Sequence, residues 1–372
     1  MMFLKACFMA RIWYSVAGEG MGHAVRSHSV IEYLKKDHDL LITAYGKAFS
    51  FLKEKYGSVV HEIQGNFIFY EDNAVLRAKT FGEFVKNFPF RAKANIFVVS
   101  RLLKDFKPDL LISDFEPASH YFSFFLKIPS ISLDNLQVLS ECKMPLPRHL
   151  EKSIVLIKPY LRFLNLRSDY FLLPVFCDAK PLNPDRTKLS KPIVRRKVMS
   201  LKPSRKGFVL VYQTSPTNEK MLKIFSQSNR EFRVYGMGRR VDKKNVFFKE
   251  FNESSFLSDL KNSEYVIVNG GFTVISEALY LGKPIISIPV KKQFEQEFNA
   301  FCVEKQGFGI ATNNFLLESL ELFESNLERY YKNLSSFKGW RDDDFKAKLN
   351  SLIQRCLKKP QPRYVLVEKL VR

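Results

Sequence analysis

The order of an apolar strand, a glycine turn and a helix occurs in both halves of the chain, and it restricts the fold more than any other feature. In the first half, the apolar run 11–17 precedes a glycine-rich turn, and residues 23–36 carry apolar side chains at helical spacing. In the second half, the apolar run 265–269 precedes two glycines, and a helical pattern begins near Thr273. Strands that alternate with helices in this way predict parallel α/β sheets.

Two such domains are expected, because 372 residues exceed what one hydrophobic core usually supports. Further strands are predicted at 40–45, 108–113, 128–133, 207–213, 231–235, 245–248 and 284–289, and further helices at 117–127, 317–331 and 343–357. Residues 179–206 hold ten Lys and Arg against one acidic residue and include several prolines, which is typical of an interdomain connection. The predicted organisation is a Rossmann-like domain over 9–173, a basic connection over 174–205, a second Rossmann-like domain over 206–335, and a C-terminal helix and tail over 336–372.

The turn after the run 265–269 has the properties of a diphosphate site. Glycine has no Cβ to hold a ligand away, so Gly270 and Gly271 allow a close approach. The start of a helix at Thr273 offers unpaired N–H groups and the positive end of the helix dipole. Glu277 lies about one turn further into that helix, where its carboxylate can accept bonds from two ribose hydroxyls.

The stretch 266–300 resembles the donor-binding region of GT-B glycosyltransferases such as MurG, the UDP-glucuronosyltransferases and the plant glucosyltransferases. The matching elements are Gly270-Gly271, Ser276-Glu277, Gly282-x-Pro284, Pro289, Glu295-Gln296 and Asn299-Ala300. The resemblance implies a GT-B fold, in which two Rossmann-like domains face each other across a cleft and the second holds a nucleotide sugar. It implies that the glycine turn meets the diphosphate and that Glu277, beside Ser276, binds ribose. It also implies that the pair Glu295-Gln296 contacts the donor sugar. The alternative, an ordinary Rossmann helix that begins after two glycines, does not explain this pair.

Two shorter segments of the second domain fit the same resemblance. Thr214 and Ser215 follow the strand 207–213, where the family places a phosphate-contacting loop. Phe251 lies in FKEFN, which resembles the segment that meets the nucleobase through main-chain atoms. Each also has an ordinary interpretation, as a polar turn for Thr214 and Ser215 and as a core aromatic residue for Phe251.

The glycine-rich turn of the first domain reads Gly18-Glu19-Gly20-Met21-Gly22-His23. A dinucleotide site would require an acidic residue near the end of the next strand, but that strand ends in Tyr45-Gly46. The turn with its His resembles the Gly-rich loop and His of MurG and the single His of the plant enzymes. The longer string GEGMGH-A-x-R-S resembles MurG-like transferases of archaea and bacteria. The resemblance implies that Gly18, Gly20 and Gly22 lie on the acceptor side.

His23 is the predicted catalytic base. An acceptor hydroxyl is a weak nucleophile until its proton is removed, and neutral imidazole is suited to this near pH 7. A carboxylate partner would fix the imidazole tautomer and stabilise its charged form. Asp114, at the end of the strand 108–113, is the first candidate because it matches the strand-end Asp of the plant enzymes, and Glu116 is the substitute. Two alternatives remain open. His23 could bind phosphate or have a structural role at the start of its helix, and Asp114 could cap the helix that begins at Pro117.

No metal ion and no cofactor are expected. The run Asp342-Asp343-Asp344 is similar to the Asp-x-Asp of metal-dependent transferases, but acidic residues at a helix start favour its dipole, and we interpret the run in that way. The other histidines show no ligand spacing, and His120, inside an aromatic helix, is interpreted as a packed residue. The five cysteines are scattered and lack a CxxC spacing, which favours a reducing cytosol.

The net charge of +21 predicts an anionic partner. Residues 76–107 hold eight Lys and Arg against two acidic residues and are interleaved with six Phe, and residues 147–167 are also basic and apolar. Such segments can lie on an anionic membrane, and their position matches the one at which MurG-like enzymes meet a lipid acceptor. The alternative is a solvated basic face over core helices. A nucleic-acid partner is not expected, because no recognised nucleic-acid motif is present.

The predicted location is the cytoplasm, with peripheral binding to the cytoplasmic face of the membrane. No run approaches the roughly 20 apolar residues that span a bilayer. Residues 1–9 are apolar but too short for a signal peptide, and Met9 is a second candidate for the first residue.

The predicted activity is transfer of a hexose or N-acetylhexosamine from a nucleotide sugar, expected to be UDP-linked, to an acceptor hydroxyl, with inversion. A nucleotide-sugar 2-epimerase of the same architecture is one alternative, although it would need acids in the cleft rather than His23. A non-catalytic nucleotide-sugar-binding protein is the other.

Overall fold

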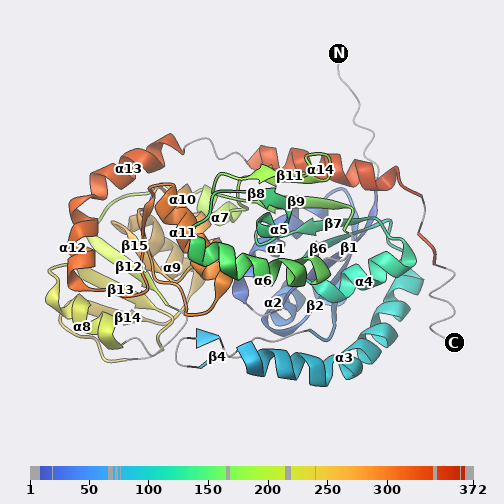
Figure 1. Cartoon of the computed structure of the whole chain (residues 1–372), viewed down its shortest axis with the longest axis horizontal. Helices are drawn as coiled ribbons and strands as arrows, with labels where there is room; N and C mark the ends of the chain where they lie inside the picture. Colours follow the sequence, from blue (N-terminus) through green and yellow to red (C-terminus); the bar gives the residue numbers. More distant parts are fainter. Residues whose placement is uncertain are drawn as a thin grey trace, which may run out of the picture. The chain divides into compact units, whose positions relative to one another are not determined.

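The computed structural model of the chain describes residues 9–18, 20–65, 70–71, 74–75, 77–164, 168–213, 219–238, 240–337, 342–360 and 362–364. The chain divides into two compact units, each with its own parallel sheet (Figure 1). The first unit comprises the residues up to 68 together with 78–191 and 342–372, and the second comprises 69–77 and 192–341. The two units are described separately below.

The first unit is built on a parallel sheet of seven strands in the order β11-β9-β7-β6-β1-β2-β3. Its strands are β1 Arg11–Val16, β2 Asp39–Ala44, β3 Val60–Glu62, β6 Leu110–Asp114, β7 Ser130–Leu133, β9 Tyr170–Pro174 and β11 Thr187–Ser190. Every residue of β6, β7 and β9 is buried. This is typical of parallel strands that helices cover on both faces, and it explains why the sequence shows them as continuous apolar runs.

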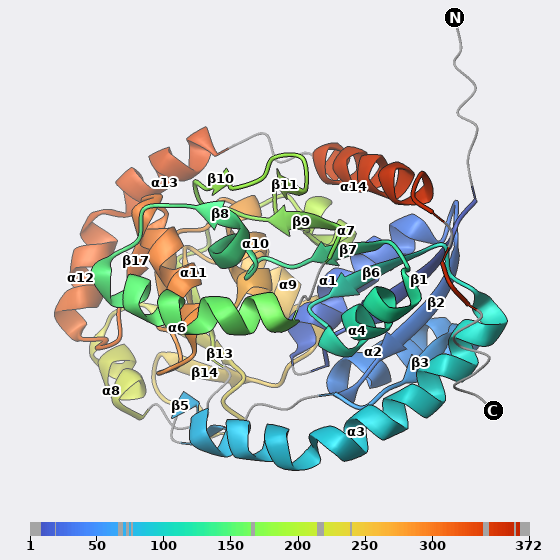
Figure 2. The same cartoon turned by 45° about the vertical axis from the view of Figure 1, so that its right-hand side comes forward.

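The helices before residue 165, together with the last helix, surround this sheet (Figures 1 and 2). They are α1 Met21–Leu34, α2 Gly46–Tyr56, η1 Gly57–Val59, α3 Arg77–Phe106, α4 Pro117–Leu126, α5 Val138–Glu141, α6 Arg148–Leu164 and α14 Asp342–Leu357. The core includes Trp13 and Leu111 from the sheet and Val99 and Leu103 from α3. A short antiparallel pair, β8 Cys142–Lys143 with β10 Lys180–Pro181, also belongs to this unit, whereas a second such pair, β4 Tyr70–Glu71 with β5 Ala74–Val75, falls in the residues 69–77 of the second unit.

The second unit is built on a parallel sheet of six strands in the order β14-β13-β12-β15-β16-β17. Its strands are β12 Phe208–Tyr212, β13 Glu231–Tyr235, β14 Val246–Lys249, β15 Val266–Val268, β16 Ile285–Ser287 and β17 Gly309–Ala311. Its helices are α7 Arg196–Met199, α8 Glu219–Gln227, α9 Glu253–Asn262, α10 Phe272–Tyr280, α11 Phe294–Lys305, α12 Leu317–Ser325 and α13 Leu327–Ser336. In its core the rings of Phe225 and Phe232 stack with centroids 4.1 Å apart.

Both sheets have a position at which the strand order reverses. In the first sheet β1 lies between β2 and β6, and in the second β12 lies between β13 and β15. Open α/β sheets bind their ligands outside the carboxyl ends of the strands at this position. β1 leads there into the turn at Gly18, β6 ends at Asp114, and β15 leads into Asn269 and Gly270. The fold therefore places Gly18 and Asp114 of the first unit, and Gly270 of the second, at the reversal of their own sheet.

The structure corrects the predicted organisation in three places. β11 lies inside the expected connection 174–205, and the units divide between Lys191 and Pro192. α14 belongs to the first unit, where it lies beside β9 and β11 in both views (Figures 1 and 2). The predicted helix 317–331 is two helices, which meet at Asn326. The basic, proline-containing composition of this segment did not indicate a strand, because an edge strand such as β11 needs only one row of hydrogen bonds and tolerates charged residues and nearby prolines.

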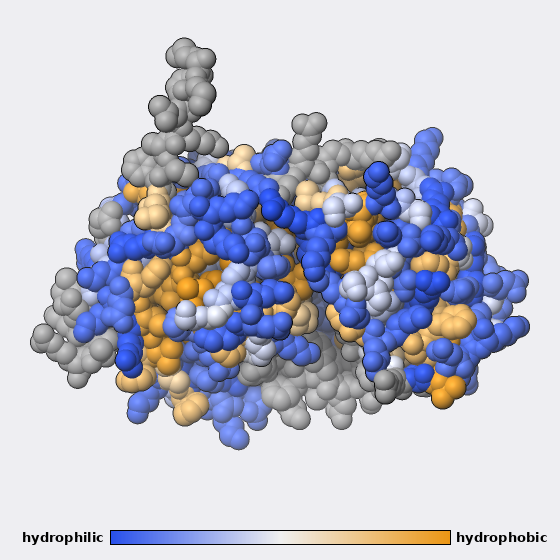
Figure 3. All heavy atoms as spheres, turned by 180° about the vertical axis from the view of Figure 1, so that it is seen from behind, coloured by the Kyte–Doolittle hydropathy of each residue, from blue (hydrophilic) through white to orange (hydrophobic). Residues whose placement is uncertain are grey.

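The surface carries both hydrophilic and hydrophobic residues. On the face drawn in Figure 3, hydrophilic residues predominate and hydrophobic areas lie between them. Among the described residues, no helix is both long enough and apolar enough to cross a membrane.

We predict opposite stability effects for two Gly→Ala substitutions. A Cβ at Gly309 would lie 1.7 Å from the carbonyl oxygen of Ile285, so Gly309→Ala must push β17 away from β16. The expected cost is about 1–3 kcal/mol, seen as a lower thermal midpoint. At Gly82 of α3 a Cβ meets nothing within 4 Å, and alanine favours a helix by up to ~1 kcal/mol, so Gly82→Ala should hold or raise the midpoint. Equal midpoints for the two variants would contradict this account of Gly309.

Candidate active site

His23 and Asp114 meet at the reversal of the first sheet. His23 is the third residue of α1, and Asp114 is the last residue of β6. The imidazole Nδ1 lies 2.8 Å from Asp114 Oδ1, with 19% of the His23 side chain exposed and none of the Asp114 side chain. A carboxylate can only accept, so a hydrogen bond to Asp114 requires the proton on Nδ1 and leaves Nε2 unprotonated. Nη2 of Arg26 also lies 2.9 Å from Nδ1, and with this tautomer that approach is a close contact of two donors and not a hydrogen bond. The structure thus brings together the two residues predicted as base and partner.

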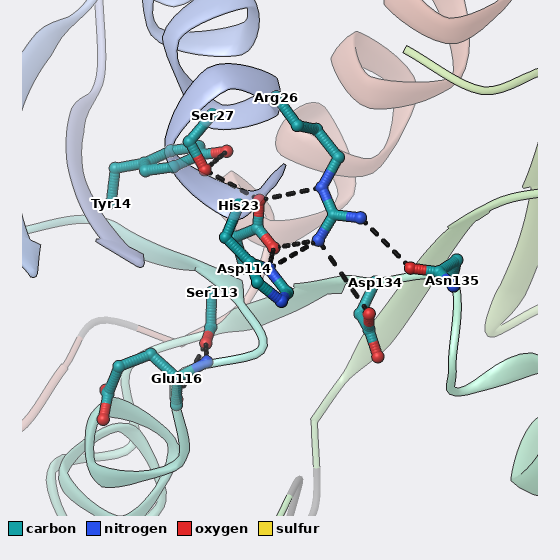
Figure 4. Close-up of polar contacts among 9 residues, drawn as sticks. All are labelled: Tyr14, His23, Arg26, Ser27, Ser113, Asp114, Glu116, Asp134 and Asn135. Atoms are coloured by element: carbon teal, nitrogen blue, oxygen red, sulfur yellow. Dashed lines mark hydrogen bonds and ion pairs between the residues drawn. The ribbon is translucent and has the colours of Figure 1, made fainter. Parts of the chain in front are cut away.

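Two more residues of α1 hold the same carboxylate (Figure 4). Arg26 donates to both oxygens, through Nη2 to Oδ1 and through Nε to Oδ2 at 3.0 Å, and Ser27 Oγ donates to Oδ2 at 2.7 Å. His23, Arg26 and Ser27 are three and four positions apart, so they share one face of the helix. Arg26 also donates through Nη1 to Asn135 Oδ1 at 3.1 Å, which ties α1 to the loop after β7.

Asp114 stays ionised because of these partners. Burial pushes the pKa of its carboxyl upward, but the charge of Arg26 and the contact with His23 outweigh burial and bring the pKa well below its ordinary value. The carboxylate is therefore a permanent acceptor for the imidazole N–H across the pH range in which proteins are folded.

Glu116 is not the substitute partner of His23, and that prediction is wrong. Its side chain caps α4 by accepting from the backbone N–H groups of Ala118 at 2.9 Å and Ser119 at 2.7 Å. Figure 4 shows its carboxylate directed away from His23. The cause is the backbone of Phe115, whose φ of 56° turns the chain out of β6 and into α4. Because Glu116 takes the cap, the alternative that Asp114 caps this helix is also excluded.

The glycines predicted on the acceptor side differ in whether the structure requires a residue without a side chain. A Cβ at Gly18 would lie 1.8 Å from the carbonyl oxygen of Tyr45, so this glycine is required by packing against the end of β2. Gly20 is the residue before α1, in an extended conformation with φ of −131°, and a Cβ there would be tolerated. Gly22 is the second residue of α1. The protein interior therefore requires glycine at position 18 but not at position 20.

In the second unit, the predicted diphosphate turn lies between β15 and α10. Gly271 is the cap residue of α10, and no side chain caps this helix. A Cβ at Gly271 would meet only Val274, at 3.7 Å, so packing does not require glycine there. Thr273, the second residue of the helix, is half-buried. A helix start with no side-chain cap keeps the chemistry expected of an anion site.

Gly270 has a role other than the predicted one. A Cβ at Gly270 would lie 2.2 Å from the carbonyl oxygen of Gln296, so the space is taken by α11 and not by a ligand. Gln296 Oε1 accepts from the N–H of Gly270 at 3.3 Å and from that of Val290 at 2.9 Å, and Asn299 Nδ2 donates to the Gly270 carbonyl at 2.8 Å. In this structure Gln296 and Asn299 hold the turn in shape, and the Oε1 of Gln296 is engaged within the protein.

Glu277 is buried and paired with Arg195, a residue that the sequence did not single out. Arg195 Nε lies 2.5 Å from Oε1 of Glu277 and Nη2 lies 2.6 Å from Oε2. Arg195 also donates to Glu253 Oε1 at 2.8 Å. Burial raises the pKa of Glu277, and Arg195 opposes that shift. The sequence did not reveal this pair, because Arg195 lies in the segment 174–205, which was interpreted as an interdomain connection.

The remaining predicted donor residues fall into three groups. Ser276 is fully buried and its hydroxyl donates to the Phe272 carbonyl at 2.7 Å, so it faces its own helix. Glu295, the second residue of α11, is half-buried. Phe251 is 59% exposed, so the interpretation as a core residue is wrong, and its ring lies 6.1 Å from that of Tyr212. The predictions for Thr214 and Ser215 lie outside the described residues.

The acidic run 342–344 and His120 behave as the sequence analysis interpreted them. α14 begins at Asp342, so the acidic run starts a helix. His120 is buried against Ser168, whose hydroxyl lies 3.1 Å from Nδ1, and burial lowers the pKa of His120 to about 3.

The comparisons with known proteins agree with this architecture. The sequence profile described as glycosyl transferase family 1 matches residues 10–329. A Methanosarcina mazei protein described as an uncharacterized glycosyltransferase is 25% identical over 328 residues, which are 80% of this chain and 84% of the relative. The chain therefore belongs to glycosyl transferase family 1, and it is a glycosyltransferase.

Two solved structures share the fold. Acinetobacter baumannii MurG superposes with a TM-score of 0.59 and 13% identity, covering 93% of this chain and 99% of that one. Phytolacca americana UGT2, solved with UDP-2fluoro-glucose and pterostilbene, superposes with a TM-score of 0.61 and 15% identity, covering 94% of this chain and 100% of that one. The fold is thus the GT-B type.

We predict that Asp114→Asn destabilises the protein strongly and in a pH-dependent way. The substitution leaves the buried cation Arg26 with only the more distant carboxylate of Asp134, at 3.9 Å, at a cost of about 3–5 kcal/mol near pH 7. Because folding lowers the pKa of Asp114, its contribution is present above the ordinary value of 3.8 and is lost as the pH falls below it. Urea unfolding should therefore show a gap between wild type and variant that narrows below about pH 4.

The matched control is Asp109→Asn at the opposite end of the sheet. Asp109 pairs with Arg11, whose side chain is 45% exposed, so the same change of charge should cost about 1 kcal/mol or less. A loss of the same size at both positions would show that Asp114 has no special role in stability.

Proposed function

We propose that this glycosyltransferase moves a hexose or N-acetylhexosamine from a UDP-sugar to an acceptor hydroxyl, with inversion and without a metal ion. The observation that carries the proposal is the His23–Asp114 contact at the reversal of the first sheet. The imidazole is partly exposed while its carboxylate partner is fully buried, which is the arrangement that a base needs to act on a bound hydroxyl.

The proposed reaction is a single displacement. His23 Nε2 takes the proton of the acceptor hydroxyl while its oxygen forms a bond to the anomeric carbon. The bond from that carbon to the diphosphate breaks, and the electron pair leaves with the diphosphate oxygen. Attack from the side opposite the leaving group inverts the anomeric configuration. Asp114 stabilises the imidazolium that forms.

The proposed donor site uses the start of α10. The positive end of the α10 dipole would stabilise the charge that develops on the diphosphate, a role that a metal ion has in other transferases. The ribose hydroxyls would donate to Glu277, which requires that Arg195 share or release that carboxylate. UGT2 of Phytolacca americana was solved with a UDP-sugar analogue, and its likeness in fold supports UDP as the first nucleotide to test.

Two alternative functions predict different experimental results. A nucleotide-sugar 2-epimerase would convert its donor without an acceptor, and a non-catalytic binding protein would hold the donor without turnover. The buried Asp114 beside a helix-borne His23 favours transfer over both, because neither alternative needs a base oriented in this way.

We predict that two substitutions separate binding from turnover. Glu277→Gln should weaken UDP binding about 10- to 100-fold, because a carboxylate accepts stronger hydrogen bonds from ribose than an amide does. His23→Ala should leave UDP affinity within about twofold and lower transfer from the active UDP-sugar about 10²- to 10⁴-fold. Calorimetry with UDP and a transfer assay with and without EDTA measure the two effects.

Glu324→Gln is the matched control for the donor site. Glu324 also pairs with an arginine, Arg230, at 3.1 Å, but on α12, so its loss should leave UDP affinity unchanged. Equal losses of affinity from Glu277→Gln and His23→Ala would contradict the assigned roles. An isomerised donor without transfer would point to the epimerase, and EDTA-sensitive transfer would remove the metal-independent part of the proposal.

We further propose that the acceptor is a membrane lipid and that the enzyme binds the cytoplasmic face of the membrane through α3. Six residues of α3 succeed one another at steps of three or four and are all exposed, namely Lys86, Phe90, Lys93, Phe97, Arg101 and Lys104. This spacing puts them on one face of the helix. Phe90 and Phe97 are 71% and 72% exposed. A stripe of alternating cationic and aromatic side chains suits the headgroup region of an anionic bilayer.

We predict that the double substitution Phe90→Ser/Phe97→Ser releases the protein from acidic liposomes. Wild type should sediment with phosphatidylglycerol vesicles at low salt, and the variant should remain in the supernatant because the apolar part of the stripe is lost. Phe125→Ser is the control, since Phe125 is 67% exposed but lies on α4. If wild type itself stays in the supernatant, the membrane part of the proposal is abandoned while the sugar-transfer part stands.

A further inference from the structure

Arg26 is a buried cation that has no step of its own in the proposed reaction. Its side chain is 3% exposed, and it is the Arg of the string GEGMGH-A-x-R-S, to which the sequence assigned no role. A guanidinium this deeply buried cannot touch a sugar, so any effect on the reaction must pass through the groups that it contacts.

The guanidinium connects three elements at the sheet edge (Figure 4). From α1 it reaches both oxygens of Asp114 at the end of β6. It donates to Asn135 at 3.1 Å and lies 3.9 Å from Asp134 Oδ1, both in the loop after β7. Its Nη2 is also 2.9 Å from His23 Nδ1. Because Arg26 contacts both Asp114 and His23, it fixes the position of the carboxylate relative to the imidazole.

This contact changes what Asp114 does to His23. A lone buried carboxylate beside an imidazole strongly favours the imidazolium, because the charged ring gains a counter-ion. Here that counter-ion is already paired with a guanidinium that stays charged at every relevant pH. The imidazole faces a neutral Arg–Asp pair, from which it receives orientation and only part of the electrostatic stabilisation.

Other groups also lie near His23 or near the residues that contact it. The aromatic ring of Phe115 stacks on the imidazole with centroids 6.0 Å apart. Tyr14 of β1 reaches Ser27 at 3.4 Å and does not reach the imidazole, and Glu116 is directed into the cap of α4. The charged groups recorded around His23 are Arg26 of α1, Asp114 of β6 and Asp134 of the loop after β7, while Glu19 lies outside the described residues.

We propose that Arg26 is a positioning residue that fixes Asp114 against His23 and offsets its charge, so that His23 remains an unprotonated base at neutral pH. The catalytic meaning rests on the proposed function, but the effect on the imidazole does not. Arg26 thereby separates the two effects of a His–Asp pair, keeping the orientation of the ring while limiting the rise in its basicity.

The test follows His23 directly by NMR titration of the full chain with ¹³C-labelled histidine. The signal of His23 is assigned by its loss in His23→Asn. Arg26→Gln should raise the titration midpoint of His23 by about one pH unit or more, because Asp114 is then unpaired. Arg26→Lys keeps the charge and should leave the midpoint within about half a unit of wild type.

Two further variants keep the test decisive. Arg11→Gln removes an ion-paired arginine from β1 at the other end of the sheet and should leave the His23 midpoint unchanged. Should Arg26→Gln fail to fold, Arg26→Gln/Asp134→Asn also removes the second nearby carboxylate and should show an upward shift of the His23 midpoint that is smaller, because one negative charge fewer lies near the imidazole. An unshifted midpoint in a folded variant without Arg26, or an equal shift in Arg11→Gln, overturns the proposal.

The pH dependence of transfer separates this inference from the proposed function. With Arg26→Gln, turnover should fall about tenfold more at pH 6 than at pH 8, since a raised midpoint leaves less neutral imidazole, and it should recover at alkaline pH. A loss that is the same at every pH would indicate a merely structural role and overturn the proposal. If the midpoint shifts but His23→Ala transfers sugar normally, the proposed function fails and the electrostatic role of Arg26 remains.

Discussion

The ionised carboxylate of Asp114 lies at the reversal of the first sheet with none of its side chain exposed. A buried charge costs several kcal/mol unless it is paired and hydrogen-bonded. Arg26, Ser27 and His23 meet this requirement from one face of α1. The helix is thereby held in one register against β6, and the same contacts orient the imidazole. Stability and site geometry depend here on one group.

The second unit meets a similar requirement in another way. Glu277 is buried on α10, and its counter-ion Arg195 comes from the segment just before α7. The turn before α10 is shaped by Gln296 and Asn299 of α11. Residues that the motif assigns to ligand contact thus also maintain the site in this structure, and a donor would bind to a turn that is already in place.

Much of the fold follows from the sequence because buried parallel strands are short apolar runs. β1, β6, β12 and β13 begin and end within two residues of the predicted bounds. The His23–Asp114 pair was predictable as well, since both residues follow strands whose carboxyl ends share one edge of the sheet. The choice between Asp114 and Glu116 was not predictable. It depends on the positive φ of Phe115, which turns the second carboxylate into the cap of α4.

The sequence by itself determined the two parallel α/β units, the glycine turn before α10 and the nature of the candidate base, because these depend on residues that are close together in the chain. The tertiary structure decided which arginine neutralises which carboxylate. Arg26 meets Asp114 across 88 positions and Arg195 meets Glu277 across 82. Periodicity reports only near neighbours, whereas a buried charge selects its partner by distance in space once the strands and helices have packed.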